Sequence, residues 1–197
     1  MTPQEIITSA RYTLNDTDAT GYRQSDAELL IYVNEGMKEI SSIRPDRFTV
    51  VGDHICTISQ CEQSFSTTLA QSILQVICIK NSTALTPFDM GTMDTFNPSW
   101  KADTPAAATQ WTAYPGDPLR FFVYPAAPAT AQTLSILYVK VPTTLLIGDS
   151  ITEVPVAMQV ALIDYVIGRA NAKDDEHSMA GLPAAEYGAF VAKIKGI

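Results

Sequence analysis

The apolar positions near both ends of the chain repeat with the period of an α-helix. Within residues 24–45 the repeat has steps of four, four and three, which predicts one apolar face of an amphipathic helix. That face consists of Leu29, Val33, Met37 and Ile40. Ser25 and Glu28 have the spacing of a capping box, which satisfies N–H groups at a helix start. Pro45 disfavours helical geometry at the preceding residue, so the helix should end there.

Three other segments have the same period. Residues 2–14 begin with a second capping box, Thr2 and Glu5. The segment after Pro155 is apolar on nearly every side, which is typical of a buried helix, so we expect it at the centre of a bundle. Its helically spaced apolar residues are Val156, Val160, Ile163, Ile167 and Ala170. Residues 183–194 form the fourth predicted helix.

Asp164 lies inside the most apolar of these helices. A buried carboxylate without a partner is costly, and the positions four residues away, Val160 and Gly168, offer none. We therefore expect an arginine from another element, Arg11 or Arg44, to pair with Asp164.

The middle of the chain has β-type patterns. Residues 47–59 are β-branched and contain Gly52-Asp53, a hairpin signal. Residues 73–80 are typical of a buried strand. Residues 119–124 and 133–141 predict an antiparallel pair, with prolines at the outer ends, where no ladder bond is lost.

Residues 94–117 are expected to form a long irregular loop, because three prolines interrupt a stretch with little periodicity. Such loops are usually functional or disordered. The loop contains both tryptophans, Trp100 and Trp111. Tryptophan is enriched at binding hot spots, so both are candidate interface residues. The alternative is that they hold the loop against the sheet.

The order of elements predicts an α+β fold. Residues 1–45 and 152–197 should form one helical bundle, and residues 46–151 an inserted β-rich domain. A chain of 197 residues suits one domain or two small ones.

Charge narrows the classes of partner. Thirteen basic and twenty-one acidic residues give a net charge of −8. This argues against a general nucleic-acid-binding surface, because such affinity rests on Lys and Arg at phosphates. The charged fraction of 17% is below the usual ~25%, which indicates that part of the surface is covered by another molecule. We expect no secretory leader and no membrane span.

The motifs of known cofactor and catalytic sites are absent, so we expect no cofactor, no metal and no enzymatic activity. Asp16 and Asp18 match the start of a calcium loop, but Ala27 stands where the twelfth-position glutamate is needed. Residues 174–177 are acidic and end in His177, which is more typical of a solvated turn than of a metal site. The three cysteines, Cys56, Cys61 and Cys78, are expected to be buried free thiols of a reducing compartment.

The order of several short motifs resembles the head-to-tail adaptors of short-tailed bacteriophages, of the tail tubular protein A type. The motifs lie in residues 23–36, in Arg44-Pro45-Asp46, in 97–100, in 118–125, in 138–142 and in 161–170. Gln24 departs from the pattern, because relatives often have tryptophan there.

The resemblance implies a structural virion protein that forms a ring, usually of twelve copies, at the head-to-tail junction. Such a ring joins the portal protein to the tail nozzle, extends the DNA channel without sequence-specific binding, and helps attach tail fibres. It would assemble in the cytoplasm of the bacterial host. On this basis Glu28, Glu35 and Glu39, on the polar face of the second helix, are candidate interface residues facing water, a neighbouring copy or the channel.

Two other classes stay open at this point. One is a small phage-encoded enzyme, which would need a compact site of acids or histidines. The other is a monomeric ligand-binding module in which the long loop covers a pocket.

Overall fold

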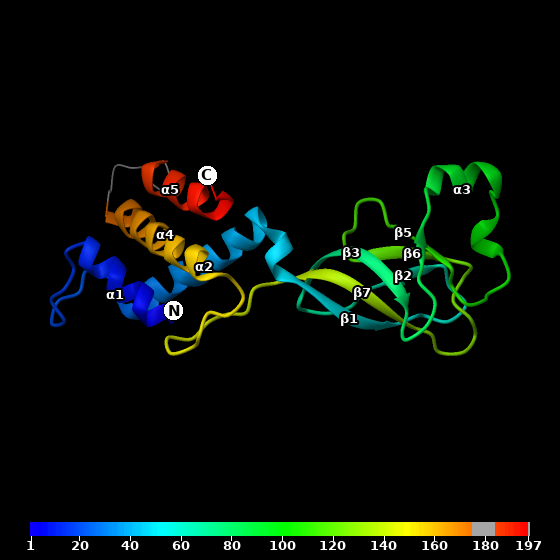
Figure 1. The fold of residues 1–197 in the computed structure, drawn as a ribbon, viewed down its shortest axis with the longest axis horizontal. Coiled ribbons are helices and arrows are strands. Elements are labelled where there is room, and N and C mark those ends of the chain that lie inside the picture. Colours follow the sequence, from blue (N-terminus) through cyan, green and yellow to red (C-terminus); the bar gives the residue numbers. More distant parts are fainter. Residues whose placement is uncertain (175–183, 197) are drawn as a thin grey trace. The chain divides into compact units, whose positions relative to one another are not determined.

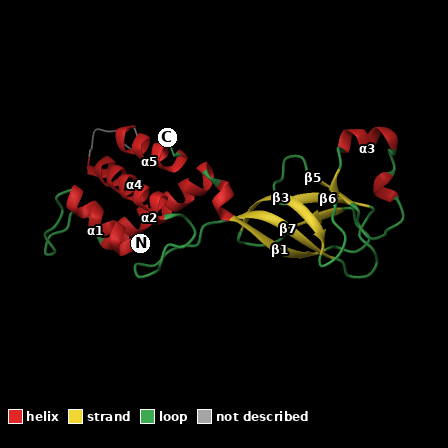
Figure 2. Cartoon of the chain, in the orientation of Figure 1, coloured by secondary structure: helices red, strands yellow, loops and turns green. Residues whose placement is uncertain are grey.

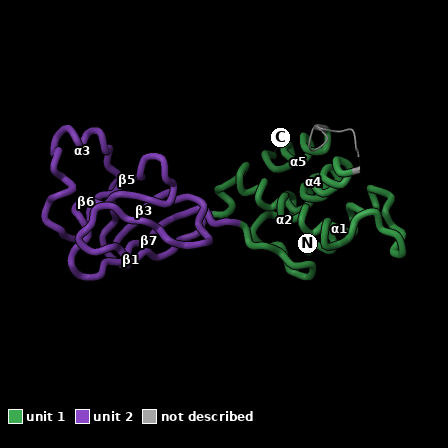
Figure 3. Tube along the Cα trace, turned by 180° about the vertical axis from the view of Figure 1, so that it is seen from behind, with its two compact units in different colours: residues 1–48, 142–197 green, residues 49–141 purple. Residues whose placement is uncertain are grey.

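The chain divides into two compact units, which are coloured separately in Figure 3. The computed structural model describes residues 1–174 and 184–196. One unit comprises residues 1–48 and 142–197, and the other residues 49–141. The expected boundaries differ from these mainly at one point. The segment 142–151, which was expected in the β-rich domain, belongs with the helices.

The helical unit is built from α1 (Pro3–Thr13), α2 (Asp26–Ile43), the short 3-10 helix η1 (Pro45–Phe48), α4 (Val156–Asp174) and α5 (Ala184–Lys195) (Figure 1). The α1 capping box is complete, since the Thr2 and Glu5 side chains each accept from the other's backbone N–H. At α2 only Ser25 acts as a cap, accepting from the Glu28 N–H. The four apolar residues expected on the α2 face, Leu29, Val33, Met37 and Ile40, are all buried.

Helix α4 packs against α1, α2 and α5, which confirms its central position. Its burial is nevertheless one-sided. Leu162 and Val166 are fully buried, whereas Val156 and Val160 are 63% and 40% exposed. The prediction that α4 is buried on nearly every side is therefore wrong for the face that carries Val156 and Val160, which is exposed in the single chain.

The segment 142–151 lies against the helices as a strap. The Asn34 side chain on α2 accepts from the Leu145 N–H at 2.7 Å and donates to the Leu145 carbonyl at 3.1 Å. The Gln4 N–H at the start of α1 donates to the Ile147 carbonyl. These bonds explain why this segment belongs with the helices although its sequence has no helical period.

The second unit contains two sheets (Figure 2). In one, β7 (Thr133–Lys140) lies between β1 (Thr49–Ile55) and β3 (Ala70–Ile79). The other has the order β2 (Glu62–Ser64), β6 (Arg120–Tyr124), β5 (Gln110–Ala113) and β4 (Thr86–Pro87). All neighbours are antiparallel except β4 and β5. The main core of this unit includes Val76, Phe121, Val123, Leu134 and Ile136, which come from both sheets.

Two predictions about strand pairing are wrong. Strand β1 runs without a break through Gly52 and Asp53, which pair with Ile136 and Ser135 of β7. Gly52 allows the Tyr138 ring to approach, since an added Cβ would lie 2.9 Å from it. The expected pair of 119–124 and 133–141 is also not formed, because β6 and β7 belong to different sheets. Their inward faces meet in the core instead of sharing a ladder.

The strand predicted at 73–80 is confirmed as part of β3. The region 94–117 is more regular than predicted. It contains the end of α3 (Met90–Phe96), the 3-10 helix η2 (Trp100–Ala102) and strand β5.

The fold is therefore α+β, with helices at both ends of the chain, as predicted. Among the described residues, no helix is both long and apolar enough to span a bilayer.

Candidate interaction sites

Glu28 on α2 is held by partners of its own chain. Its Oε1 accepts from the Tyr32 hydroxyl at 3.0 Å and pairs with the Lys173 ammonium of α4 at 2.5 Å. The hydrogen bond from Lys173 lowers the pKa of Glu28. Burial, together with the bond to Glu28, raises the pKa of Tyr32 to about 12.

Glu35 and Glu39 continue this contact along α2. The Glu35 carboxylate lies 3.1 Å from the Arg169 guanidinium of α4, which sits 5.4 Å from the centre of the Tyr32 ring. The Tyr187 hydroxyl of α5 donates to Glu39 at 2.6 Å. We call this row of contacts between α2 and α4–α5 the acidic seam.

The acidic seam changes the interpretation of the three glutamates. Each is half-buried and has a partner on another helix of the same unit. A pattern of acids on one helix face does not distinguish a solvent-facing side from one that meets cations of another helix. The partners on α4 and α5 were not identified from the sequence, although Arg169 lies in one of the family-like motifs. A role of these acids in contacts between copies stays a prediction.

Asp164 pairs with a lysine and not with either predicted arginine. Its Oδ2 lies 2.5 Å from the Lys193 ammonium of α5, and the two side chains are 22% and 45% exposed. Arg44 pairs instead with Asp46. The prediction failed because α5, the helix beside α4 at this point, supplies the cation.

Arg11 organises the turn between α1 and α2. Its guanidinium pairs with Asp16 at 2.5 Å and Asp26 at 2.7 Å, and donates to the Gln24 carbonyl. It also stacks 3.6 Å from the centre of the Tyr22 ring. Gln24 stands where relatives of the family that the chain resembles often have tryptophan. Its amide nitrogen donates to the Ala170 carbonyl, which ties this turn to α4.

The geometry of this turn does not support calcium binding. Asp16 is buried against the Arg11 cation, and the Asp18 carboxylate accepts from Thr20. In the described ranges, 1–174 and 184–196, no three His, Cys, Asp or Glu side chains are grouped as for a metal ion. Residues 175–177 of the acidic turn lie outside the described residues.

Trp100 is fully buried in a small aromatic cluster of the second unit. Its ring meets Phe88 and Phe122 edge-on, with 5.5 Å between centroids in each pair. Its Nε1 donates to Asp94 at 2.7 Å. These contacts join η2, the α3 segment and β6, so this residue has the contacts expected if it holds the loop in place.

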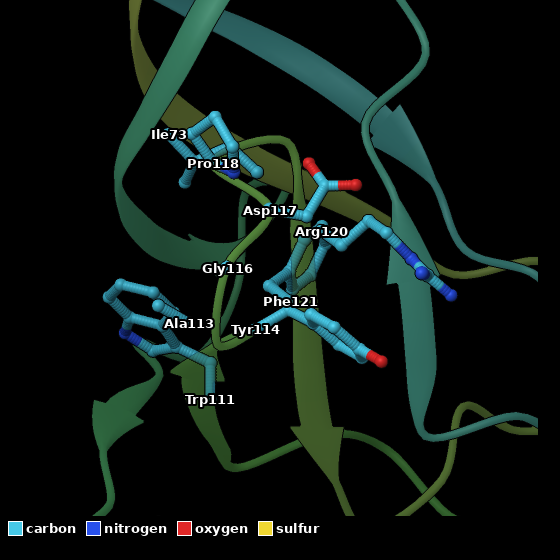
Figure 4. A pocket seen from close by; sticks show the side chains of 9 residues that line it. All are labelled: Ile73, Trp111, Ala113, Tyr114, Gly116, Asp117, Pro118, Arg120 and Phe121. Carbon is cyan, nitrogen blue, oxygen red and sulfur yellow. The ribbon is translucent and has the colours of Figure 1, made fainter.

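Trp111 is also buried, but beside an open cavity. The cavity has a volume of about 310 Å³, and Figure 4 shows its lining, with the Trp111 indole and the Arg120 guanidinium on opposite sides of this view. Within the part of the chain that the structure describes, the Trp111 Nε1 has no hydrogen-bond partner. Arg120 is held by Glu62 and by stacking 4.4 Å from the Tyr114 ring centre.

The cysteines are free thiols. Cys56 and Cys61 are buried and Cys78 is half-buried. Burial raises the pKa of Cys56 to about 11 and also raises that of Cys61. High thiol pKa values disfavour the thiolate, the form that reacts as a nucleophile.

A comparison with protein families matches the whole chain, residues 1–197, to the model described as SU10 adaptor protein. The chain belongs to this family. The expectation of a structural adaptor protein is thereby confirmed at family level, while the short-tailed type is not tested.

Among solved structures, eleven chains give a significant match. One is a chain from the neck of an empty GTA particle computed with C6 symmetry. It is 15% identical, with 95% of this chain and 87% of the other covered, and the TM-score is 0.32. A search of curated proteins gives no significant match.

Proposed function

We propose that this adaptor protein is the repeating subunit of a ring at the bacteriophage head-to-tail junction. The ring, with twelve copies expected, joins the portal to the tail nozzle and extends the DNA channel. It also offers attachment places for tail fibres. The observation that carries the proposal is the family match over residues 1–197.

The charges of the helical unit suit a channel through which DNA slides without binding tightly to the wall. The described cations of this unit that are engaged by carboxylates of the same chain include Arg11, Arg44, Arg47, Arg169, Lys173 and Lys193. The whole chain retains a net charge of −8. DNA affinity depends on cations that replace the counterions at phosphates, so paired cations and excess acids favour sliding over binding.

A native mass measurement tests the proposal. The purified chain is measured alone over a range of concentrations, and again with purified portal rings. We expect one ring of adaptor copies on each portal, with a single mass. A chain that stays monomeric and does not bind portal rings would exclude the adaptor function.

The same measurement separates the two alternatives from the ring. A monomeric ligand-binding module, for which the cavity beside Trp111 is the candidate site, would not add mass to portal rings. A small phage-encoded enzyme would also remain separate from the portal. Virion fractions probed for the chain then test its place in the particle, and fractions from the host cytoplasm test where it is assembled.

A further inference from the structure

Helix α4 carries an apolar stripe that its own chain leaves partly uncovered. Val156, Val160, Ile163 and Ile167 follow one another at steps of four, three and four, so they lie on one side of the helix. Val156 and Val160 are 63% and 40% exposed, and the two isoleucines are half-buried. We call these four residues the α4 stripe.

The α4 stripe lies on the side of α4 away from α2. The contacts with α2 are made by Leu162, Tyr165 and Arg169, which approach Gly36 and Glu35. At 3.6 residues per turn these positions are on the opposite side of α4 from the stripe.

A second exposed apolar patch is formed by α2 and the strap, on the side of α2 that faces away from α4. Ile31 of α2 is 57% exposed, and Leu146 and Ile147 of the strap are 67% and 37% exposed. The Asn34–Leu145 hydrogen bonds bring the strap beside the turn of α2 that carries Ile31. Ile31 lies on the side of α2 away from Gly36 and hence away from α4. We call these three residues the strap patch.

We propose that the α4 stripe of one copy docks on the strap patch of the next copy, and that this is the lateral contact of the ring. The inference rests on the proposed ring function. A contact between two different faces can be repeated around a ring, whereas a stripe-to-stripe contact closes at two copies and leaves the strap patch exposed. The helical unit has exposed aliphatic side chains on two different faces, which is what a contact between different faces of neighbouring copies requires.

The charges beside the two patches are compatible with this pairing. The open face of α2 carries Lys38, which has no hydrogen-bond or ion-pair partner in the described part of the chain. The charged residue beside the stripe on α4 is Asp164, which is paired with Lys193. Because Lys193 already compensates Asp164, docking of the stripe on the strap patch buries no unpaired carboxylate of α4.

A mixing experiment with two full-length variants tests the contact. Val160→Glu places a charge on the stripe, and Ile31→Glu places one on the strap patch. Each variant alone should lose lateral association by about tenfold or more, because the charge would be buried without a partner. Each retains one intact patch, so an equimolar mixture should form 1:1 heterodimers and no larger rings. Association is measured by analytical ultracentrifugation with one variant fluorescently labelled.

Three controls make the outcome decisive. Leu69→Glu, at a 59% exposed leucine of the β-rich unit, should assemble like the wild type. Thermal unfolding shows whether each variant is folded, and Val156→Glu repeats the stripe test at a more exposed position. All variants are measured with and without portal rings.

Each outcome has one meaning. Heterodimers in the mixture together with weak self-association support the inference. If Val160→Glu, Val156→Glu and Ile31→Glu all assemble like the wild type, the contact lies elsewhere, while the ring function stands. If Val160→Glu loses association while Ile31→Glu assembles like the wild type, the contact is stripe to stripe, which overturns the inference. Loss of association by both variants without heterodimers in the mixture also overturns it, because the two patches then do not pair. A wild type that is monomeric both alone and with portal overturns the proposed function itself.

Discussion

Gly36 of α2 lies so close to Leu162 of α4 that a methyl group has no room between them. A Cβ added at Gly36 would be 2.7 Å from the Leu162 Cδ2 and 3.1 Å from the Tyr165 ring. Glycine is a poor helix former, so its place inside α2 has a packing reason. The absence of a side chain lets the two helices approach, and that approach brings the acidic seam together.

Gly36→Ala should therefore destabilise the protein although alanine favours helices. Alanine gains about 1 kcal/mol in helix propensity, whereas overpacking a core contact costs about 1–3 kcal/mol. Gly188→Ala is the matched control, since no atom of the described residues lies within 4 Å of a Cβ there. That variant should gain stability. Urea unfolding measures both, and a more stable Gly36→Ala would contradict the close packing.

Arg11 and Asp16 should behave as a coupled buried pair. Removing one partner of such a pair costs about 3–5 kcal/mol, because the other charge stays buried and unpaired. We expect Arg11→Met to be strongly destabilising, and Arg11→Met with Asp16→Asn to recover part of the loss. Denaturant unfolding of the two single variants and the double variant gives the coupling energy. Additive effects would show that the pair is not coupled.

The acidic seam predicts that charge reversal at Glu35 acts inside the chain. If Glu35 faced only water, a neighbouring copy or the channel, its reversal would spare folding and would impair ring assembly or DNA passage. Glu35→Lys now faces Arg169 and should cost about 1 kcal/mol or less, because the pair is 36% exposed on each side.

The double variant Glu35→Lys with Arg169→Glu separates the two roles of Glu35. Thermal unfolding reports the internal role and ring assembly the external one. If stability and assembly both recover in the double variant, Glu35 acts through Arg169. If stability recovers but assembly does not, Glu35 contacts a neighbouring copy or another partner.

Tyr32 should make the helical unit sensitive to alkaline pH. Its pKa is raised to about 12, mainly by burial, whereas an unfolded tyrosine has a pKa near ~10. The native state thus holds the proton more tightly. The stabilisation is complete below about pH 10 and is lost as pH rises toward 12. Glu28, Glu35 and Arg169 are the charged groups that act on this hydroxyl.

Tyr32→Phe should flatten the fall in stability over that alkaline range. Tyr12→Phe, at a 74% exposed tyrosine, is the matched control. Tyr165 and Tyr187, whose pKa values are also raised, leave a residual slope in both variants. The measurement is urea unfolding at several pH values, with tyrosinate absorbance as an independent titration. An unchanged slope in Tyr32→Phe would contradict the assignment.

Trp100 should prove to be a structural residue of the β-rich unit. Trp100→Ala removes a fully buried ring and should cost about 3–5 kcal/mol. An interface anchor would show a different signature, with unchanged unfolding and weaker assembly. Asp94→Asn, which retains an oxygen acceptor for the Trp100 Nε1, should cost much less.

Local patterns were sufficient to predict the helices and their buried faces. The starts of α1 and α2 follow from caps at Thr2 and Ser25, and the inner face of α2 follows from a spacing that depends only on helix geometry. The central position of α4 also follows, because an apolar helix needs partners. These features depend on residues close together in the sequence.

Partners between distant segments could not be predicted in this way. Lys193 for Asp164, Arg169 for Glu35 and the two separate sheets of β6 and β7 each depend on which elements meet in space. Side-chain periodicity identifies a buried face but does not specify what covers it.

The sequence by itself determined the α+β class, the helical ends and the family of adaptor proteins, because these depend on local periodicity and on the order of short motifs. Only the tertiary structure decided that the glutamates of α2 meet cations of their own chain and that one face of α4 stays uncovered. The physical reason is that burial and charge pairing are properties of packed elements, fixed by close approaches such as Gly36 against Leu162.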